Sequence, residues 1–318
     1  MKKIIALFIT ALTALILTAS VSAEAYFEEL SWTYAVKIDG TAILTGYSGF
    51  LQGNVELPSE IDGYKVTEID EYCFKDDLAS FSVTIPGTIK TIPDSAFAGC
   101  YGLYEVVFSD GVEVIESYAF RDCYGLEKIS FSDSIRIIGD YAFTECSSLE
   151  EIKLPDNLRD MGDGVFSYCT SLKSADLGNG IKEIKMYAFY NCSELEEVVI
   201  RKSVRRIRYN SFDDCDSLAR VYYGGTRSEW RDIVPGSAEE LDDAYIIFNV
   251  TDETLEELYH KKPDKSTEYL MIAVYAVVVV ALVAVVLIIL FRRKTICPDC
   301  GAVPSKGEKF CVKCGREL

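Results

Sequence analysis

Histidine is nearly absent from this sequence, which has a single one, His260, among 318 residues. One histidine cannot build a metal site from several imidazoles within one chain, and it leaves little material for histidine-dependent catalysis. We find no nucleophile–base arrangement, no phosphate-binding loop and no metal site with an open position. We therefore expect a protein that is not an enzyme.

Basic residues are scarce in the long central part of the chain. Residues 24–268 carry 47 Asp and Glu against 23 Lys and Arg, a net charge of −24. Generic nucleic-acid binding needs clustered basic side chains to contact the phosphates, so we expect no nucleic-acid partner. The positive charge in excess lies at the two ends, in residues 1–23 and 292–318.

The N-terminal end has the composition of a secretory signal. Lys2 and Lys3 precede an apolar run, and the small residues 21–23 close it. This pattern predicts a signal peptide over residues 1–23, cleaved after Ala23. The alternative is a first membrane helix that stays attached, for which the run is short. In either case the following chain lies outside the cell.

A second apolar segment predicts a membrane anchor. Residues 269–291 are 23 in number and contain no charged side chain. At about 1.5 Å per residue, such a helix exceeds the roughly 30 Å hydrocarbon thickness of a bilayer. Residues 292–294 are all basic, and such residues stay on the cytoplasmic side. We predict a single-pass cell-membrane protein with residues 24–268 outside and the C-terminus in the cytoplasm.

The external part is organised by a 23-residue period. The clearest columns of this repeat are phenylalanine (Phe74, Phe97, Phe120, Phe143, Phe166, Phe189, Phe212), cysteine (Cys100, Cys123, Cys146, Cys169, Cys192, Cys215) and leucine (Leu103, Leu126, Leu149, Leu172, Leu195, Leu218). Several columns in phase predict a solenoid in which each coil buries its apolar residues against its neighbours. We expect one strand per coil, stacked in parallel about 4.8 Å apart, and a short helical or turn segment at the Ala-Phe step.

The repeat resembles the BspA-type bacterial leucine-rich repeat. The segment Ile-Gly-Asp-Tyr-Ala-Phe-Thr-Glu-Cys at 138–146 carries the resemblance, which extends over about residues 55–233. It implies a solenoid of parallel strands and short helical turns, of about seven units over 55–233. Members of this family are expected at cell surfaces, in adhesion and cell-surface interaction.

The two ends of the repeat array differ from the regular units. A hairpin around Asp39-Gly40 predicts an N-terminal cap over residues 24–54. In the first unit Asp77 stands where cysteine is expected, and residues 62–65 indicate an inserted turn. Residues 221–230 resemble the ending of such arrays. Residues 252–259, with Thr251 as N-cap, predict a short helix in a C-terminal cap and linker over 234–268.

The periodic cysteines permit two interpretations. A secreted domain is exposed to oxidation, and stacked coils bring neighbouring Cα atoms within disulfide range. Equivalent side chains in a ladder, however, point the same way rather than at each other. A buried thiol beside core leucine and phenylalanine behaves as a small hydrophobe, so we favour reduced, structural thiols.

The outward side chains of the predicted strands form a candidate binding face. They vary from coil to coil while the inward columns do not, which suits recognition. The alternative is an ordinary solvated face with cross-strand ion pairs such as Lys153 with Asp176. The candidate ligand-binding residues are Lys128, Glu151, Lys153, Asp176, Glu197, Arg220 and Tyr222. Two further features are a basic cluster over residues 201–208 and a tyrosine column, Tyr72, Tyr118, Tyr141 and Tyr187, that could stack on sugars or simply pack at the turn.

The cytoplasmic tail contains two Cys-x-x-Cys-Gly motifs. The four candidate metal ligands are Cys297, Cys300, Cys311 and Cys314. Four thiolates predict a closed, tetrahedral, structural Zn²⁺ site, and residues 296–318 are similar to the short zinc-ribbon family. A thiol redox pair or an iron site are the alternatives. With so small a core, metal binding should supply most of the folding energy of this segment, on the order of 10 kcal/mol.

Two functions fit these segments together. The first is a membrane-anchored surface protein whose extracellular solenoid binds a protein or glycan ligand. The second is a transmembrane sensor or assembly factor whose zinc ribbon docks a cytosolic protein, since a passive anchor needs no folded tail.

Overall fold

The computed structural model describes residues 30–234, 241, 244–255, 310, 313–315 and 317. The chain divides into two units, residues 1–250 and 251–318. Within the described ranges no helix has the length and apolar character needed to cross a bilayer. The predicted signal peptide and the predicted span 269–291 lie outside the described residues.

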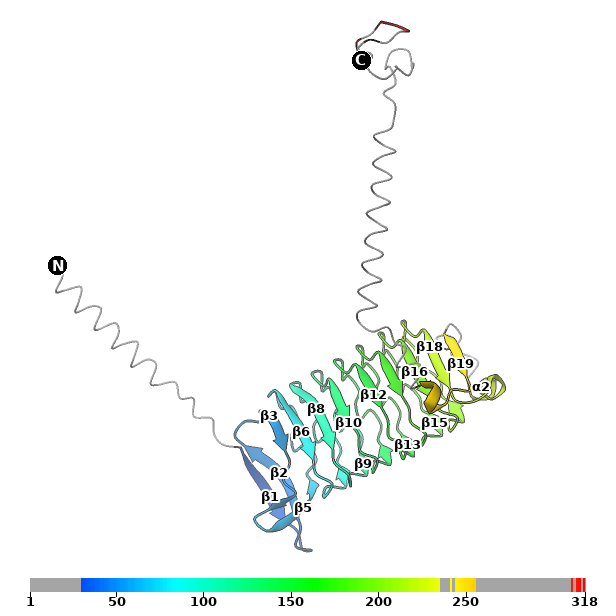
Figure 1. The fold of residues 1–318 in the computed structure, drawn as a ribbon. Helices are drawn as coiled ribbons and strands as arrows, with labels where there is room; N and C mark the ends of the chain where they lie inside the picture. Colours follow the sequence, from blue (N-terminus) through cyan, green and yellow to red (C-terminus); the bar gives the residue numbers. More distant parts are fainter. Residues whose placement is uncertain are drawn as a thin grey trace, which may run out of the picture. The chain divides into compact units, whose positions relative to one another are not determined.

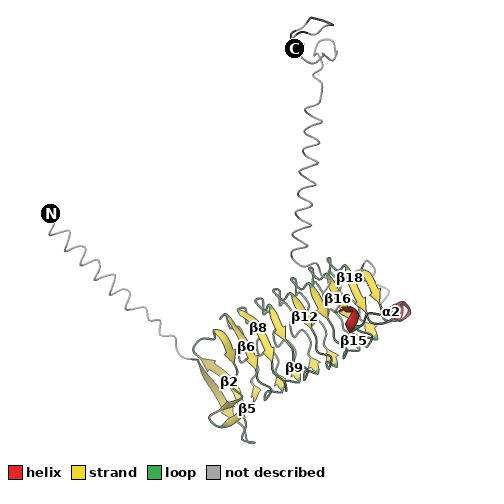
Figure 2. Ribbon diagram, in the orientation of Figure 1, coloured by secondary structure: helices red, strands yellow, loops and turns green. Residues whose placement is uncertain are grey.

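The first unit is a β-solenoid in which each coil contributes one longer strand to a parallel row (Figures 1 and 2). The row comprises two hydrogen-bonded sheets. The first contains β3 (Gly53–Glu56), β6 (Phe81–Ile85), β8 (Leu103–Phe108) and β10 (Lys128–Ser130). The second contains β12 (Glu151–Lys153), β14 (Ser174–Asp176), β16 (Glu197–Ile200), β18 (Arg220–Tyr223) and β19 (Tyr245–Phe248). The predicted parallel stack is confirmed, and it extends past the last 23-residue unit because β19 pairs in parallel with β18.

A second row of short strands lies on the other side of each coil. One sheet contains β7 (Thr91–Ile92), β9 (Val114–Ile115), β11 (Ile137–Ile138) and β13 (Asp160–Met161); β15 (Glu183–Ile184) pairs with β17 (Arg206–Ile207). The second residue of each strand is buried and belongs to the apolar column five positions before phenylalanine. The sequence indicated the buried column but not the strands, because two residues are too few to show an alternating pattern.

The Ala-Phe segment is a turn rather than a helix, and it repeats as regularly as the strands. Each turn contains two residues with positive φ. The first is at Tyr72, Ser95, Tyr118, Tyr141, Gly164, Tyr187 and Asn210, with φ of 54° to 60°, and the second follows four residues later. Left-handed backbone costs a non-glycine residue about 1–2 kcal/mol. The turn compensates with a backbone ladder, in which the phenylalanine N–H donates to a carbonyl of the next coil, as from Phe120 to Ala142 at 2.8 Å.

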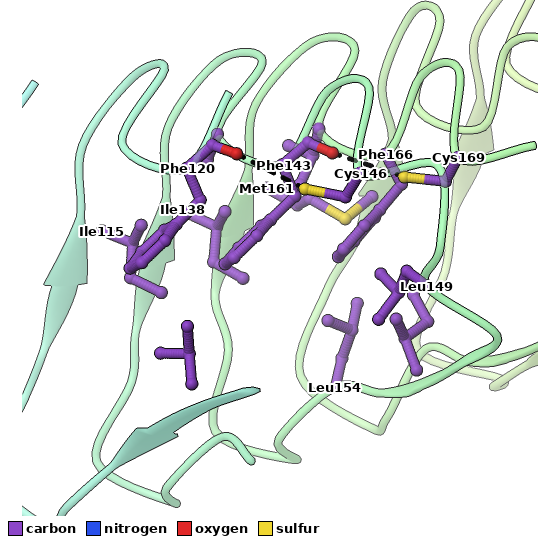
Figure 3. Close-up of a cluster of buried hydrophobic side chains, with 14 of the residues drawn as sticks. Ile115, Phe120, Ile138, Phe143, Cys146, Leu149, Leu154, Met161, Phe166 and Cys169 are labelled. Atoms are coloured by element: carbon purple, nitrogen blue, oxygen red, sulfur yellow. Dashed lines mark hydrogen bonds between the residues drawn. The ribbon is translucent and has the colours of Figure 1, made fainter. Parts of the chain in front are cut away.

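The seven phenylalanine rings form a continuous stack through the core. Figure 3 shows three of them, Phe120, Phe143 and Phe166. Neighbouring ring centroids are 4.6 to 5.7 Å apart, with planes within 12° of parallel. This spacing lies in the favourable range for offset-stacked rings. From Phe97 to Phe189 the rings are fully buried, so each coil contributes a ring that its neighbours on both sides cover.

The six periodic cysteines are buried free thiols that form a hydrogen-bond ladder beside the rings. Each thiol donates to the carbonyl of the phenylalanine in the preceding coil, as from Cys146 to Phe120 at 3.4 Å and from Cys169 to Phe143 at 3.3 Å (Figure 3). The other four bonds measure 3.0 to 3.2 Å. The prediction of reduced thiols in the core is confirmed. The first unit differs from this ladder: Asp77 takes the place of the cysteine, and its carboxylate accepts a hydrogen bond from the Tyr47 hydroxyl.

The N-terminal cap is a mixed sheet. It contains the predicted hairpin of β1 (Ser31–Val36) and β2 (Ala42–Ser48), then β5 (Tyr64–Ile69) and β4 (Glu60–Ile61). The inserted turn is the tight connection between β4 and β5, where Asp62 and Gly63 both have positive φ. Tyr47 stacks on Phe74 at 5.6 Å and covers the exposed end of the phenylalanine stack.

The C-terminal end of the array begins with α2 (Arg227–Ile233). Thr226 and Glu229 form a capping box at its start, and Trp230 packs against Tyr223 with ring centroids 5.1 Å apart. In the second unit, residues 252–255 are helical and the Thr251 hydroxyl accepts from the Thr254 N–H, as predicted for an N-cap. Residues 256–259 of the predicted helix lie outside the described residues.

The stack makes a prediction for Phe143. The Phe143→Ala change should lower the free energy of unfolding of the solenoid by about 3–5 kcal/mol, because it removes a fully buried ring and interrupts the stack on both sides. Urea denaturation of residues 24–262 would measure the change. Ile137→Ala, at a more exposed position, should cost less than about 0.5 kcal/mol. Equal urea midpoints for Phe143→Ala and the unaltered protein would contradict the stacked core.

The thiol ladder predicts a loss of stability at alkaline pH. Burial raises the pKa of the Cys169 thiol from 9.0 to about 12. As pH rises, the unfolded chain loses this proton at a lower pH than the folded protein does. The stabilisation is therefore complete below pH 9 and declines as pH rises toward about 12. Cys169→Ala should make the decline of unfolding free energy with pH shallower, by up to about 1.4 kcal/mol per pH unit.

Val165→Ala provides the control, because it also opens the buried core but removes no titrating group. It should lower stability at every pH and leave the slope unchanged. Parallel curves for Cys169→Ala and Val165→Ala between pH 8 and about 11 would refute the role of the thiol.

Candidate functional site

The outward side chains of the long strands form two columns, as the sequence predicted. Strand register aligns Glu151, Ser174, Glu197 and Arg220 in one column, and Lys153, Asp176, Val199 and Tyr222 in the other. Lys128 lies opposite Glu105 at the end of the first sheet. We call this surface the outer face. All seven candidate residues therefore lie on it, but they differ strongly in exposure.

The middle of the outer face is open. Lys128, Glu151 and Lys153 are exposed. Lys128 pairs with Glu105 at 2.9 Å, and the Lys128 side chain remains 68% exposed. Within the described part of the chain, neither Glu151 nor Lys153 makes an ion pair. These two opposite charges on β12 are available to an external partner without breaking an internal contact.

The C-terminal part of the outer face is closed. The Asp176 carboxylate is held by the Arg201 guanidinium, with Nη2–Oδ2 at 2.7 Å and Nε–Oδ1 at 3.2 Å, and both side chains are nearly buried. The ion pair considered between Asp176 and Lys153 is therefore replaced by one with Arg201. Glu197 is 4% and Tyr222 8% exposed. In this conformation these residues stabilise the array rather than offer a surface.

Arg220 combines features of the open and the closed parts, because it is both paired and partly exposed. Its guanidinium is 3.3 Å from the Glu197 carboxylate and 3.8 Å from that of Glu196, while 41% of its side chain stays exposed. Arg220 therefore neutralises the buried Glu197 charge and still reaches solvent.

The basic cluster over residues 201–208 is largely neutralised. Besides Arg201, Lys202 pairs with Glu229 at 3.2 Å, and both Arg206 and Arg208 pair with Glu183. Charge balancing therefore accounts for most of this cluster. No patch of unpaired basic residues forms there to bind an anionic polymer, as far as the described residues show.

The turns carry a second surface that the sequence indicated only in part. The tyrosine column includes Tyr118 and Tyr141, whose rings stack at 5.6 Å with planes 4° apart. A hollow beside them is lined also by Arg121, Thr144, Glu145, Ser167 and Tyr168, none of which the sequence singled out. Their common signal is position: they lie three or four residues after the first left-handed residue of each turn.

Of the four predicted zinc ligands, only Cys314 lies among the described residues. It is exposed, Gly315 after it has a φ of 76°, and Phe310 forms an antiparallel bridge with Glu317. A left-handed glycine directly after cysteine suits a tight turn behind a metal knuckle. Cys297, Cys300 and Cys311 lie outside the described residues, so the zinc site stays a prediction.

Comparison with protein families decides the nature of the repeat. The model described as BspA type leucine-rich repeat region matches residues 67–192 and 113–232, in six copies. Together these matches cover just over half of the chain. The chain belongs to the BspA-type leucine-rich repeat family. The leucine-rich repeat solenoid is typically a non-enzymatic scaffold, and no catalytic family is indicated.

The chain is similar to several solved structures of bacterial proteins. A leucine-rich repeat protein of T. pallidum is 26% identical, with 72% of this chain and 99% of that chain covered and a TM-score of 0.51. A leucine-rich repeat protein from Bacteroides ovatus is 22% identical, with 63% of this chain and 71% of that chain covered and a TM-score of 0.43. The pneumococcal vaccine antigen PcpA is 18% identical, with 63% of this chain and 56% of that chain covered and a TM-score of 0.46. A search of curated proteins gave no significant match.

Proposed function

We propose that this BspA-type repeat protein is a membrane-anchored receptor or adhesin that binds a protein ligand outside the cell through the open part of its outer face. The observation that carries this proposal is the pair of exposed charges Glu151 and Lys153, which make no ion pair within the described residues. Surface charges that are already paired contribute little to a new contact, whereas unpaired ones can be matched by a partner.

The shape of the outer face supports a protein ligand. The row of long strands runs over nine coils, and side chains of both signs project from its middle. A partner with complementary charges would gain orientation and association rate from them. Membrane anchoring rests on the apolar segment 269–291 and the basic residues after it, and adhesion rests on the family.

Charge reversal on β12 tests the proposal. Residues 24–262 would be screened on an array of extracellular proteins, and the variant Glu151→Lys with Lys153→Glu should bind each captured ligand at least about tenfold more weakly. The variant keeps the net charge, so a general change in electrostatic attraction cannot explain a loss. Lys182→Glu, at an exposed position before the short strand β15, is the control and should bind normally. Unchanged binding by the β12 variant would refute the outer face as the binding site.

A second function is favoured by the paired Cys-x-x-Cys-Gly motifs. We propose that Cys297, Cys300, Cys311 and Cys314 hold a structural Zn²⁺ and that the folded tail docks a cytosolic protein. Four thiolates suit zinc, which would supply most of the folding free energy of so small a segment. Four thiolates complete the tetrahedral coordination of zinc, so no position would stay open for a water molecule.

Zinc content and partner capture test the tail. The purified full chain should contain one zinc ion per chain by elemental analysis, and Cys314→Ser should lower both the zinc content and its resistance to chelators. Residues 292–318 should capture a cytosolic partner in the unaltered form but not in the Cys314→Ser form. Zinc bound without any zinc-dependent partner would leave the tail as a structural element and favour the first function alone.

A further inference from the structure

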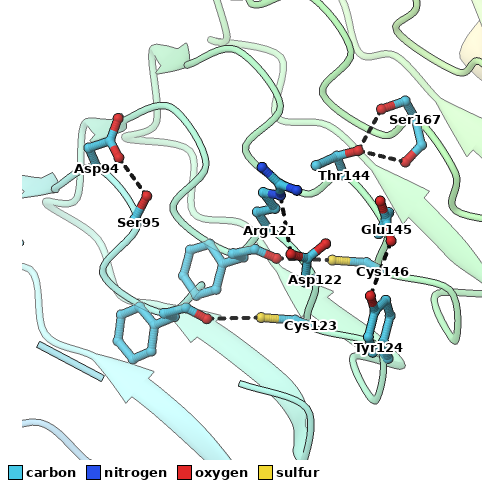
Figure 4. A network of polar contacts seen from close by, with 12 residues as sticks. Asp94, Ser95, Arg121, Asp122, Cys123, Tyr124, Thr144, Glu145, Cys146 and Ser167 are labelled. Atoms are coloured by element: carbon cyan, nitrogen blue, oxygen red, sulfur yellow. Dashed lines mark hydrogen bonds and ion pairs between the residues drawn. The ribbon is translucent and has the colours of Figure 1, made fainter. Parts of the chain in front are cut away.

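A hollow of about 270 Å³ lies on the turn side of the solenoid, away from the long strands. It spans three successive turns, which contribute Tyr118 and Arg121, then Tyr141, Thr144 and Glu145, then Ser167 and Tyr168. Figure 4 shows Arg121, Glu145, Thr144 and Ser167 gathered at this point. We call it the turn cleft.

One wall of the turn cleft is aromatic. Tyr118 and Tyr141 stack face to face, and the Arg121 guanidinium lies 5.8 Å from the centre of the Tyr118 ring. The next position of the tyrosine column is Gly164. A Cβ there would lie 2.2 Å from the Tyr141 ring, so the absence of a side chain allows Tyr141 its position and interrupts the column. Gly164 therefore stands where the coils on either side have Tyr141 and Tyr187.

The floor is made of hydroxyl groups that are buried and paired. The Thr144 and Ser167 hydroxyls lie 2.6 Å apart, and the Ser167 hydroxyl donates to the Gly164 carbonyl at 2.9 Å. Thr144 is 6% and Ser167 2% exposed. Comparable positions in other coils hold lysine, alanine, arginine, tyrosine or aspartate. A fixed polar floor of small side chains leaves room above it.

The rim provides hydrogen-bonding groups of both kinds. The Glu145 carboxylate accepts from the Tyr124 hydroxyl at 3.2 Å, and Arg121 pairs with Asp122 at 3.2 Å (Figure 4). Tyr168 is 42% exposed. Burial, followed by neighbouring carboxylates, raises the pKa of Tyr124 and of Tyr141, so these phenols remain protonated donors at neutral pH. The rim therefore combines a carboxylate, a guanidinium and phenol hydroxyls.

We propose that the turn cleft binds a neutral sugar residue of a glycan. A pyranose ring has an apolar face of C–H groups that fits an aromatic ring, and its hydroxyls pair with carboxylate, guanidinium and phenol groups. The cleft is slightly smaller than the roughly 300–1,000 Å³ of typical small-molecule sites, so it suits one sugar unit of a longer chain. Glu145 and Asp122 outweigh the single Arg121, which disfavours an acidic sugar or a phosphate. The proposal is independent of the outer face, because no residue is shared.

Saturation-transfer NMR on the full chain tests this proposal. The chain would be kept in a detergent without a sugar headgroup, and the probes would be methyl glycosides of neutral hexoses and N-acetylhexosamines at up to about 10 mM, with N-acetylneuraminic acid for comparison. At least one neutral glycoside should receive saturation and bind in the millimolar range or tighter. No transfer to any neutral glycoside, or preference for the acidic sugar, would overturn the proposal.

Three variants locate the binding. Glu145→Gln preserves the shape of the side chain and should weaken binding at least about tenfold, as should Tyr168→Ser at the exposed rim. Tyr187→Ala is the matched control, because Tyr187 belongs to the same column but lies outside the cleft. Thermal unfolding followed by circular dichroism would verify that each variant is folded. Binding that survives both Glu145→Gln and Tyr168→Ser, or that Tyr187→Ala abolishes equally, would show that the sugar binds elsewhere and refute the turn cleft.

Discussion

The stacking of one coil on the next is the interaction on which this molecule depends. No 23-residue coil can bury its own phenylalanine ring, because both faces of that ring are covered by equivalent rings of the coils before and after it. The polar groups follow the same rule. Backbone N–H groups of the turns donate to the next coil, and each of the six periodic cysteine thiols donates to the preceding one. Apolar burial and hydrogen bonding therefore both run along the axis of the solenoid, and stability is close to a sum of neighbour contacts.

An array held together in this way requires special residues at its ends. At the N-terminal end Tyr47 takes the place of a preceding phenylalanine, and its hydroxyl donates to Asp77, which stands at the cysteine position. At the other end α2 places Trp230 against Tyr223, and β19 adds one more parallel strand. The irregular residues of the first and last units are thus consequences of the regular ones, because each replaces a contact that an interior coil receives from its neighbour.

Because the core and backbone ladders use the inward columns, the outward positions are free to differ. This freedom produces two distinct surfaces. The outer face presents Glu151 and Lys153 in its open middle and is closed by the Asp176–Arg201 pair farther along. The turn cleft arises where Gly164 interrupts a tyrosine column and leaves small hydroxyl residues beneath. One surface is charged and broad, the other aromatic and confined, which suits a protein ligand for the first and a sugar unit for the second.

The sequence by itself determined the solenoid, its period, its parallel strands and the buried state of its cysteines. Each of these follows from columns that recur every 23 residues, and a recurring column has one physical environment. It could not reveal the two-residue strands or the left-handed turn residues, since neither has a pattern longer than a few positions. The sequence also could not show which side chains of the outer face are exposed. Lys153 and Asp176 lie opposite each other in register. Only the folded chain brings Arg201, 25 residues after Asp176, into contact with the Asp176 carboxylate. The turn cleft depends on side chains from three coils at once. Tertiary structure decided these features because each results from contacts between different coils rather than from the pattern within one.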